Sequence, residues 1–100
     1  MADRQELLHK WSFPHVQHHG VTLVARADAA ACVERIFAEG CSFYGYDSFT
    51  LFRNGKIQPH MGCSPSWEKG ATPLLAALLA ELESHPAGVT HYEFVFESAA

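Results

Sequence analysis

The chain has 100 residues, of which 48% are hydrophobic and 18% are charged. This composition is too apolar for a disordered segment, and the length suits one domain, 1–100, with one core. The net charge is −4, and residues 71–100 contain acidic side chains but no Lys or Arg. Because a nucleic-acid binder needs a basic stripe to meet the phosphates, we expect no direct nucleic-acid binding.

Membrane insertion and export are also disfavoured by the sequence. No apolar run approaches the roughly 20 residues that a membrane helix needs. Residues 1–11 contain no apolar stretch of the signal-peptide type. The cysteines are odd in number and far apart, which favours reduced thiols over a disulfide framework: Cys32, Cys41 and Cys63. We therefore expect a cytoplasmic protein with no membrane partner.

The first predicted element is a short helix over residues 3–12, whose apolar side chains share one face: Leu7, Leu8 and Trp11. Pro14 disfavours helical structure at the residue before it and ends this helix. Residues 14–20 are predicted to be a loop. Residues 21–27 are predicted to be a strand, because β-branched residues predominate there and the two faces alternate.

A second helix is predicted from Asp28, a suitable N-cap, to about Glu39. Gly40 is placed to end it in the left-handed conformation. The aromatic residues 42–52 then form a predicted strand, in which Gly45 indicates a bulge or bend.

The pair Asn54–Gly55 predicts a two-residue type I′ turn after that strand. Such a turn pairs Phe52 with Ile57, and Leu51 with Gln58. Pro59 cannot donate to a ladder, so the second arm must be short or lie at a sheet edge there.

The last third is predicted to contain a helix and a strand. Thr72 and Pro73 have the character of an N-cap and a first helical residue for a helix over 73–85. Residues 90–97 alternate as a strand, with Tyr92, Phe94 and Phe96 on one face. The segment 60–70 between the hairpin and this helix is interpreted as a connection that Trp67 anchors to the core.

Without the first helix, the element order is β-α-β-β-α-β. This order predicts an α+β fold, namely a ferredoxin-like βαββαβ sandwich with an antiparallel sheet and both helices on one face. The predicted core spans 20–97, and residues 1–14 add an N-terminal helix and loop. A half-covered sheet also fits the alternation in 90–97.

Two kinds of reactive site can be considered. A Zn²⁺ ion needs three or four converging nitrogen or sulfur ligands, and the candidates are His15, His18, His60 and Cys63. His60 and Cys63 are also the candidate catalytic residues, with Cys63 as a nucleophile that a nearby His could activate, although no third, orienting residue is evident. A related alternative is a small dimeric enzyme that uses His60 or Cys63 beside an aromatic pocket, lined by Trp67 and the aromatic residues of 43–49.

The predicted helix 73–85 is apolar around most of its circumference, so it needs cover on more than one side. The N-terminal helix, a second copy of the chain or a protein partner can supply that cover. Acidic side chains in the same third of the chain suit a basic partner. The predicted partner-binding residues are Leu75, Leu79, Glu81, Glu83, Glu93 and Glu97.

The absence of a convergent catalytic set favours binding over catalysis. We therefore predict a small protein-binding or regulatory module of the inhibitor, immunity or adaptor type, with no cofactor. In this prediction the acidic residues steer the encounter and an apolar helix or sheet face makes the contact. The aromatic-pocket enzyme and the zinc protein are the alternatives.

Overall fold

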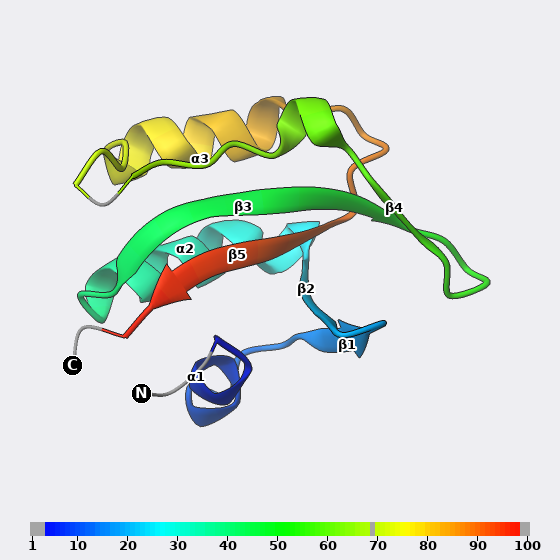
Figure 1. Cartoon of the computed structure of the whole chain (residues 1–100), viewed down its shortest axis with the longest axis horizontal. Coiled ribbons are helices and arrows are strands. Elements are labelled where there is room, and N and C mark those ends of the chain that lie inside the picture. The colour runs from blue at the N-terminus through cyan, green and yellow to red at the C-terminus, as the bar shows by residue number, and fades with distance from the viewer. Residues whose placement is uncertain (1–3, 69, 99–100) are drawn as a thin grey trace.

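The computed structural model describes residues 4–68 and 70–98 (Figure 1). Within these ranges the chain forms the following helices and strands in order: α1 (Arg4–Lys10), β1 (Val16–His18), β2 (Val21–Ala25), α2 (Arg26–Ala38), β3 (Ser42–Leu51), β4 (Ile57–Pro59), α3 (Leu75–Ser84) and β5 (His91–Glu97). A short 3-10 helix, η1 (Met61–Cys63), follows β4. In the same ranges, no helix has the length and apolar character that crossing a bilayer requires.

The strands form a curled antiparallel sheet in the order β1-β2-β5-β3-β4. The predicted α+β class is confirmed, but the ferredoxin-like strand order is wrong. That order places the first and third strands of the βαββαβ core in the centre, whereas the second and fourth, β3 and β5, are central here. Pro59 gives a physical reason, since it has no N–H to donate and its strand, β4, lies at the sheet edge.

Helices α2 and α3 pack on one face of the sheet, which we call the inner face; in Figure 1, α2 lies behind β3 and β5. The predicted alternation in the last strand is confirmed, since Tyr92, Phe94 and Phe96 are buried. The same core contains buried residues of β2, β3 and both helices: Val24, Ala29, Cys32, Val33, Ile36, Phe43, Tyr46, Leu78 and Leu82. The opposite side of the sheet is the outer face.

Helix α1 confirms the predicted N-terminal helix and adds Leu7 and Leu8 to this core. Trp11 stacks on Phe96 with the ring centroids 6.0 Å apart. The Arg35 guanidinium of α2 lies 5.3 Å from the Trp11 ring centroid. Helix α1 therefore packs on β5 beside α2.

The prediction of a loop over 14–20 is wrong, because β1 pairs with β2 in a tight hairpin. His19 and Gly20 form its turn with φ angles of 51° and 79°. Two consecutive positive φ values are the requirement of a type I′ turn. The turn sequence is His19–Gly20 and not the Asn-Gly or Asp-Gly pair that is typical of such turns. The sequence pattern therefore did not indicate the hairpin.

Helix α2 begins at Arg26, before the predicted N-cap Asp28, and no side chain caps it. Its first backbone N–H, that of Arg26, instead donates to the carbonyl of Thr90 at 2.8 Å. The start of the helix is thus fixed by a neighbouring segment. Its predicted end is confirmed, since Gly40 follows with φ of 72°.

The hairpin at Asn54–Gly55 exists, but its predicted register is wrong by one residue. Leu51 pairs with Ile57, and the Phe52 N–H donates to the Lys56 carbonyl at 2.9 Å. The loop therefore contains three residues, with Gly55 at φ 85° after a turn closed by its N–H bond to the Phe52 carbonyl. This is the three-residue loop in which glycine takes the left-handed position.

The connection 60–72 runs along β3 before α3 begins. Trp67 packs on Phe43 and Tyr46, with ring centroids 6.3 and 6.4 Å apart, which confirms its predicted anchoring role. Thr72 donates its hydroxyl to the Phe43 carbonyl at 2.6 Å. The predicted helix start at Thr72–Pro73 is therefore wrong: Thr72 is tied to β3, and α3 starts at Leu75.

Candidate functional site

His60 and Cys63 lie one turn apart but their side chains have different surroundings. The His60 ring Nε2 lies 2.5 Å from the Thr50 hydroxyl. Cys63 is half-buried and packs against the core. No hydrogen bond joins the two side chains in the described part of the chain. The structure therefore places the predicted pair in the same short segment without forming a base–nucleophile contact.

Two of the predicted zinc ligands, His15 and His18, use a ring nitrogen for separate backbone contacts. His15 Nδ1 lies 2.7 Å from the Phe13 carbonyl, and His18 Nε2 bonds the Gly55 carbonyl. In residues 4–68 and 70–98 no group of three or more His, Cys, Asp or Glu side chains has an arrangement that could hold a metal ion. The structure thus does not bring His15, His18, His60 and Cys63 together.

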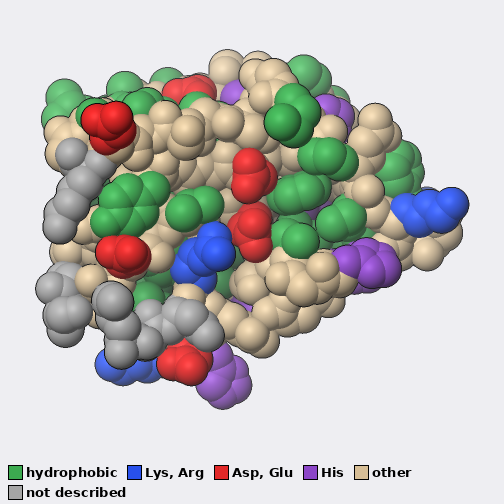
Figure 2. Space-filling model, in the orientation of Figure 1, with side chains coloured by type: hydrophobic (Ala, Val, Ile, Leu, Met, Phe, Trp, Pro, Cys, Tyr) green, Lys and Arg blue, Asp and Glu red, His purple; other side chains and the backbone are tan. Residues whose placement is uncertain are grey.

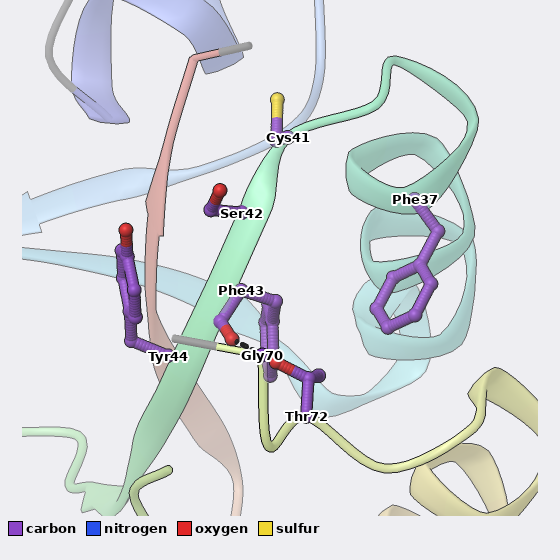
Figure 3. Close-up of a pocket in the computed structure, with 7 residues that line it drawn as sticks. All are labelled: Phe37, Cys41, Ser42, Phe43, Tyr44, Gly70 and Thr72. Carbon is purple, nitrogen blue, oxygen red and sulfur yellow. Dashed lines mark hydrogen bonds between the residues drawn. The ribbon is translucent and has the colours of Figure 1, made fainter. Parts of the chain in front are cut away.

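Two open hollows involve the aromatic residues of β3. One, of about 320 Å³, lies at the start of β3 (Figure 3) and is lined by Phe37, Cys41, Ser42, Phe43, Tyr44, Gly70 and Thr72. Figure 3 shows that the Cys41 sulfur points away from the Phe37 and Phe43 rings. A ligand site usually combines an apolar cavity with converging polar groups, and the described residues around this hollow do not provide that convergence.

The second hollow, of about 260 Å³, lies where the connection 60–72 meets β3. It is lined by Trp67 and its neighbours: Tyr44, Gly45, Tyr46, Asp47, Ser64, Pro65, Ser66 and Val95. Ligand pockets typically have about 300–1,000 Å³, so this hollow is small for a substrate. Neither His60 nor Cys63 lines it. The aromatic residues and the proposed reactive pair are therefore in different places.

A polar network that the sequence did not reveal joins β3 to the end of α3. The buried Tyr46 donates its hydroxyl to Glu81 at 3.0 Å, and His85 Nε2 lies 2.7 Å from the same oxygen. Burial lowers the pKa of His85, although the Glu81 charge opposes this effect. Glu81 and His85 are four residues apart within the predicted helix 73–85, and this spacing, typical of side chains on one helix side, is the signal that could have indicated the network.

Arg26 is a second position that the sequence did not reveal. Its guanidinium donates to carbonyls at the end of α3 and in the loop behind it, at 2.6–3.5 Å: Leu82, Glu83, His85, Pro86 and Val89. These carbonyls have no partners within the helix, and a cation also suits the negative end of the helix dipole. Arg26 therefore caps α3 from outside the helix.

The predicted acidic residues lie on different sides of the molecule. Glu81 points inward to Tyr46, and Glu83 is exposed on α3. Glu93 lies directly opposite Asp47 on the outer face, and Glu97 accepts a bond from the Tyr44 hydroxyl at 3.1 Å. Figure 2 shows two acidic side chains together in the middle of the sheet face that is turned to the viewer. The acidic side chains thus form separate features of the surface.

The helices present apolar side chains to solvent. Leu74, just before α3, is 82% exposed, and a shallow groove of about 190 Å³ runs between α2 and α3. The predicted residues Leu75 and Leu79 are half-buried against the core. We use the term helical face for the groove between α2 and α3 together with the exposed apolar side chains of α3 and of the residue before it: Ala27, Ala30, Leu74, Ala76, Ala77, Leu79 and Ala80.

Comparisons with protein-family models, with curated proteins and with solved structures gave no match to this chain.

Proposed function

We propose that this chain is a protein-binding module that docks a partner on its helical face. The observation that carries this proposal is the exposure of Leu74, at 82%, beside a run of exposed alanines on α3. Exposed apolar side chains that form a continuous surface mark interaction sites more often than isolated ones do. An inhibitor, immunity or adaptor role is compatible with such a module.

The chemistry of the helical face favours a protein over a small ligand or a membrane. The groove between α2 and α3 has about 190 Å³, below the roughly 300 Å³ at which ligand pockets begin. Helices that lie on membranes carry Lys or Arg on their polar face, and α3 contains neither. An apolar protein side chain of the partner, such as leucine or phenylalanine, suits the groove.

The expected partner carries basic groups around its apolar contact. Glu83 lies at the edge of the groove, and the whole chain has a net charge of −4. The outer-face carboxylates Glu93 and Glu97 add to the field that a basic partner meets during approach. Glu81 is committed to Tyr46, so we leave it out of the contact surface.

The test is affinity capture from an extract of the cells that naturally make this chain. We expect one protein to be retained by the wild type and by Ala38→Asp, a control at an exposed alanine of α2 outside the helical face. Leu74→Asp and Ala77→Asp should each reduce its retention about tenfold, the effect of losing 1.4 kcal/mol of binding free energy. Equal retention by all four proteins would show that the partner does not use the helical face.

Two further measurements define the partner. The mass in solution shows whether the captured protein is a second copy of this chain. Reversal of Glu93 and Glu97 to Lys should slow association at low salt and have little effect at high salt, because exposed charges are screened. Unchanged association rates at both salt concentrations would show that Glu93 and Glu97 do not steer the partner. Docking on the helical face would not be affected by that result.

A further inference from the structure

The hairpin β1–β2 leaves the main sheet and reaches a loop at the opposite edge. β2 pairs with β5 only at Val24 and Ala25, whereas Val21–Leu23 pair with β1 alone. At the far end of β1, the His18 ring donates from Nε2 to the Gly55 carbonyl in the β3–β4 loop. Since β1 and β4 are the two edge strands, this bond closes the curl of the sheet.

Two buried apolar residues, one in the hairpin and one in β3, do not belong to the main core. Leu23 is 0% exposed and Phe49 is 8% exposed, yet neither is part of the cluster beneath α2 and α3. Phe49 lies opposite His91 on the outer face. Leu23 and His91 line one hollow of about 210 Å³ together with Pro14, His15 and Val16 of the N-terminal segment. Residues of the hairpin and of the segment before it thus lie against His91, next to Phe49 on the outer face.

Histidines are concentrated where the hairpin meets the sheet. The His18 and His19 rings are 5.0 Å apart, and His91 is close enough to His18 for their charges to interact. Burial lowers the pKa of His91, and the His18 charge lowers it further. A protonated His18 keeps its Nε2–H donor, so acid does not remove the bond to Gly55. When His18 is already protonated, a second positive charge at His91 repels it and so opposes closure of the hairpin.

Other charged groups surround these histidines. From α2, Asp28 lines the same hollow and favours positive charge there. Glu93 follows on β5, and its carboxylate accepts the Thr22 N–H of the hairpin at 3.3 Å. The β3–β4 loop that receives His18 carries Arg53 and Lys56, which disfavour further positive charge.

We propose that the β1–β2 hairpin is an acid-responsive flap, which is closed against the outer face at His91 at neutral pH and opens when His18 and His91 both carry a proton. Burial holds the pKa of His91 below the usual 6.5, so the opening belongs to acidic pH, below about pH 6.5. This device is independent of binding at the helical face, which lies on the other side of the sheet.

Amide hydrogen exchange measures the opening directly. After correction for intrinsic exchange, the opening constant of the amides in Val16–Leu23 should rise about tenfold between pH 7.5 and pH 5. The amides of the β3–β5 ladder report global unfolding and serve as an internal reference, so their opening constant should rise clearly less than that of the hairpin. His91→Gln should abolish the rise, whereas His9→Gln, an exposed position on α1, should preserve it.

A second variant keeps the proposal testable if His91→Gln alters the fold. His18→Gln retains a side-chain N–H donor for Gly55 and cannot be charged, so it should also remove the rise. The proposal is overturned if hairpin exchange does not depend on pH, or if both glutamine variants keep the wild-type rise. A parallel rise in the hairpin and in the β3–β5 ladder would indicate global unfolding by acid and would equally overturn it.

Discussion

At the scale of single residues, Gly45 is a position where one added carbon atom is expected to disturb the fold. The β3–β5 register shifts between Phe43 and Gly45, as the predicted bulge requires, and Gly45 has φ of 150°. A Cβ there would lie 2.4 Å from the Pro65 carbonyl oxygen. The connection 60–72 can approach β3 this closely only because the residue is glycine.

Gly45→Ala should therefore lower the free energy of unfolding by about 2 kcal/mol or more, from backbone strain and the contact with Pro65. Urea denaturation measures this loss. The matched control is Gly62→Ala, where an added Cβ meets nothing within 4 Å and φ is not positive. Equal denaturation midpoints for the two variants would contradict the close approach of the connection to β3.

His85 predicts how stability depends on pH. Burial holds its pKa below the usual 6.5 in the folded chain, so the unfolded chain binds more protons between the two pKa values. The free energy of unfolding therefore carries no penalty from His85 above about pH 6.5. It decreases as the pH falls from there toward the folded-state pKa. His85→Gln should reduce this decrease, whereas His9→Gln should leave it unchanged. Denaturation midpoints at pH 7.5 and 5.5 measure it, and an identical decrease in all three proteins would contradict this role.

At the scale of elements, α3 depends on Arg26 for the satisfaction of its last carbonyls. Lysine can keep the charge but cannot reproduce the planar fork of donors. Arg26→Lys should therefore cost about 2 kcal/mol, the scale of hydrogen bonds that involve a charged group. Urea denaturation of Arg26→Lys measures this loss of free energy of unfolding. Arg53→Lys, at an exposed position on the β3–β4 loop, is the control. A loss no greater than in the control would show that the cap contributes little.

Most elements were predictable from local patterns, and the errors occurred where a distant segment decides the outcome. Helix α1, the bulge at Gly45 and the alternation of β5 follow from spacing and glycine chemistry. The start of α2 at Arg26 depends on Thr90, and the start of α3 depends on the bond from Thr72 to Phe43. Neither partner is near in sequence, so no capping pattern could indicate it.

At the scale of the whole molecule, the strand order was the main feature that the sequence left open. Both possible orders satisfy the same alternation in β5, because either leaves one face of the sheet covered by helices. Pro59 alone disfavoured an internal third strand, and β4 does lie at the edge. The closing contact from His18 to Gly55 joins residues 37 positions apart, which no local pattern encodes.

The candidate surface was predictable in part. The apolar circumference of 73–85 indicated a helix in need of cover, and Leu78 and Leu82 obtain that cover inside the chain. The part left exposed depends on how α2 packs beside α3. For this reason Ala27 and Ala30 of α2, which line the groove, were not among the predicted residues.

The most direct test of the central claim, that the helical face docks a protein, is site-specific photo-cross-linking in the cells that make this chain. A photoreactive residue at Ala80 should yield one discrete cross-linked product. The same residue at Gln58, exposed on edge strand β4, should yield none. No product from Ala80, or the same product from both positions, would contradict the claim.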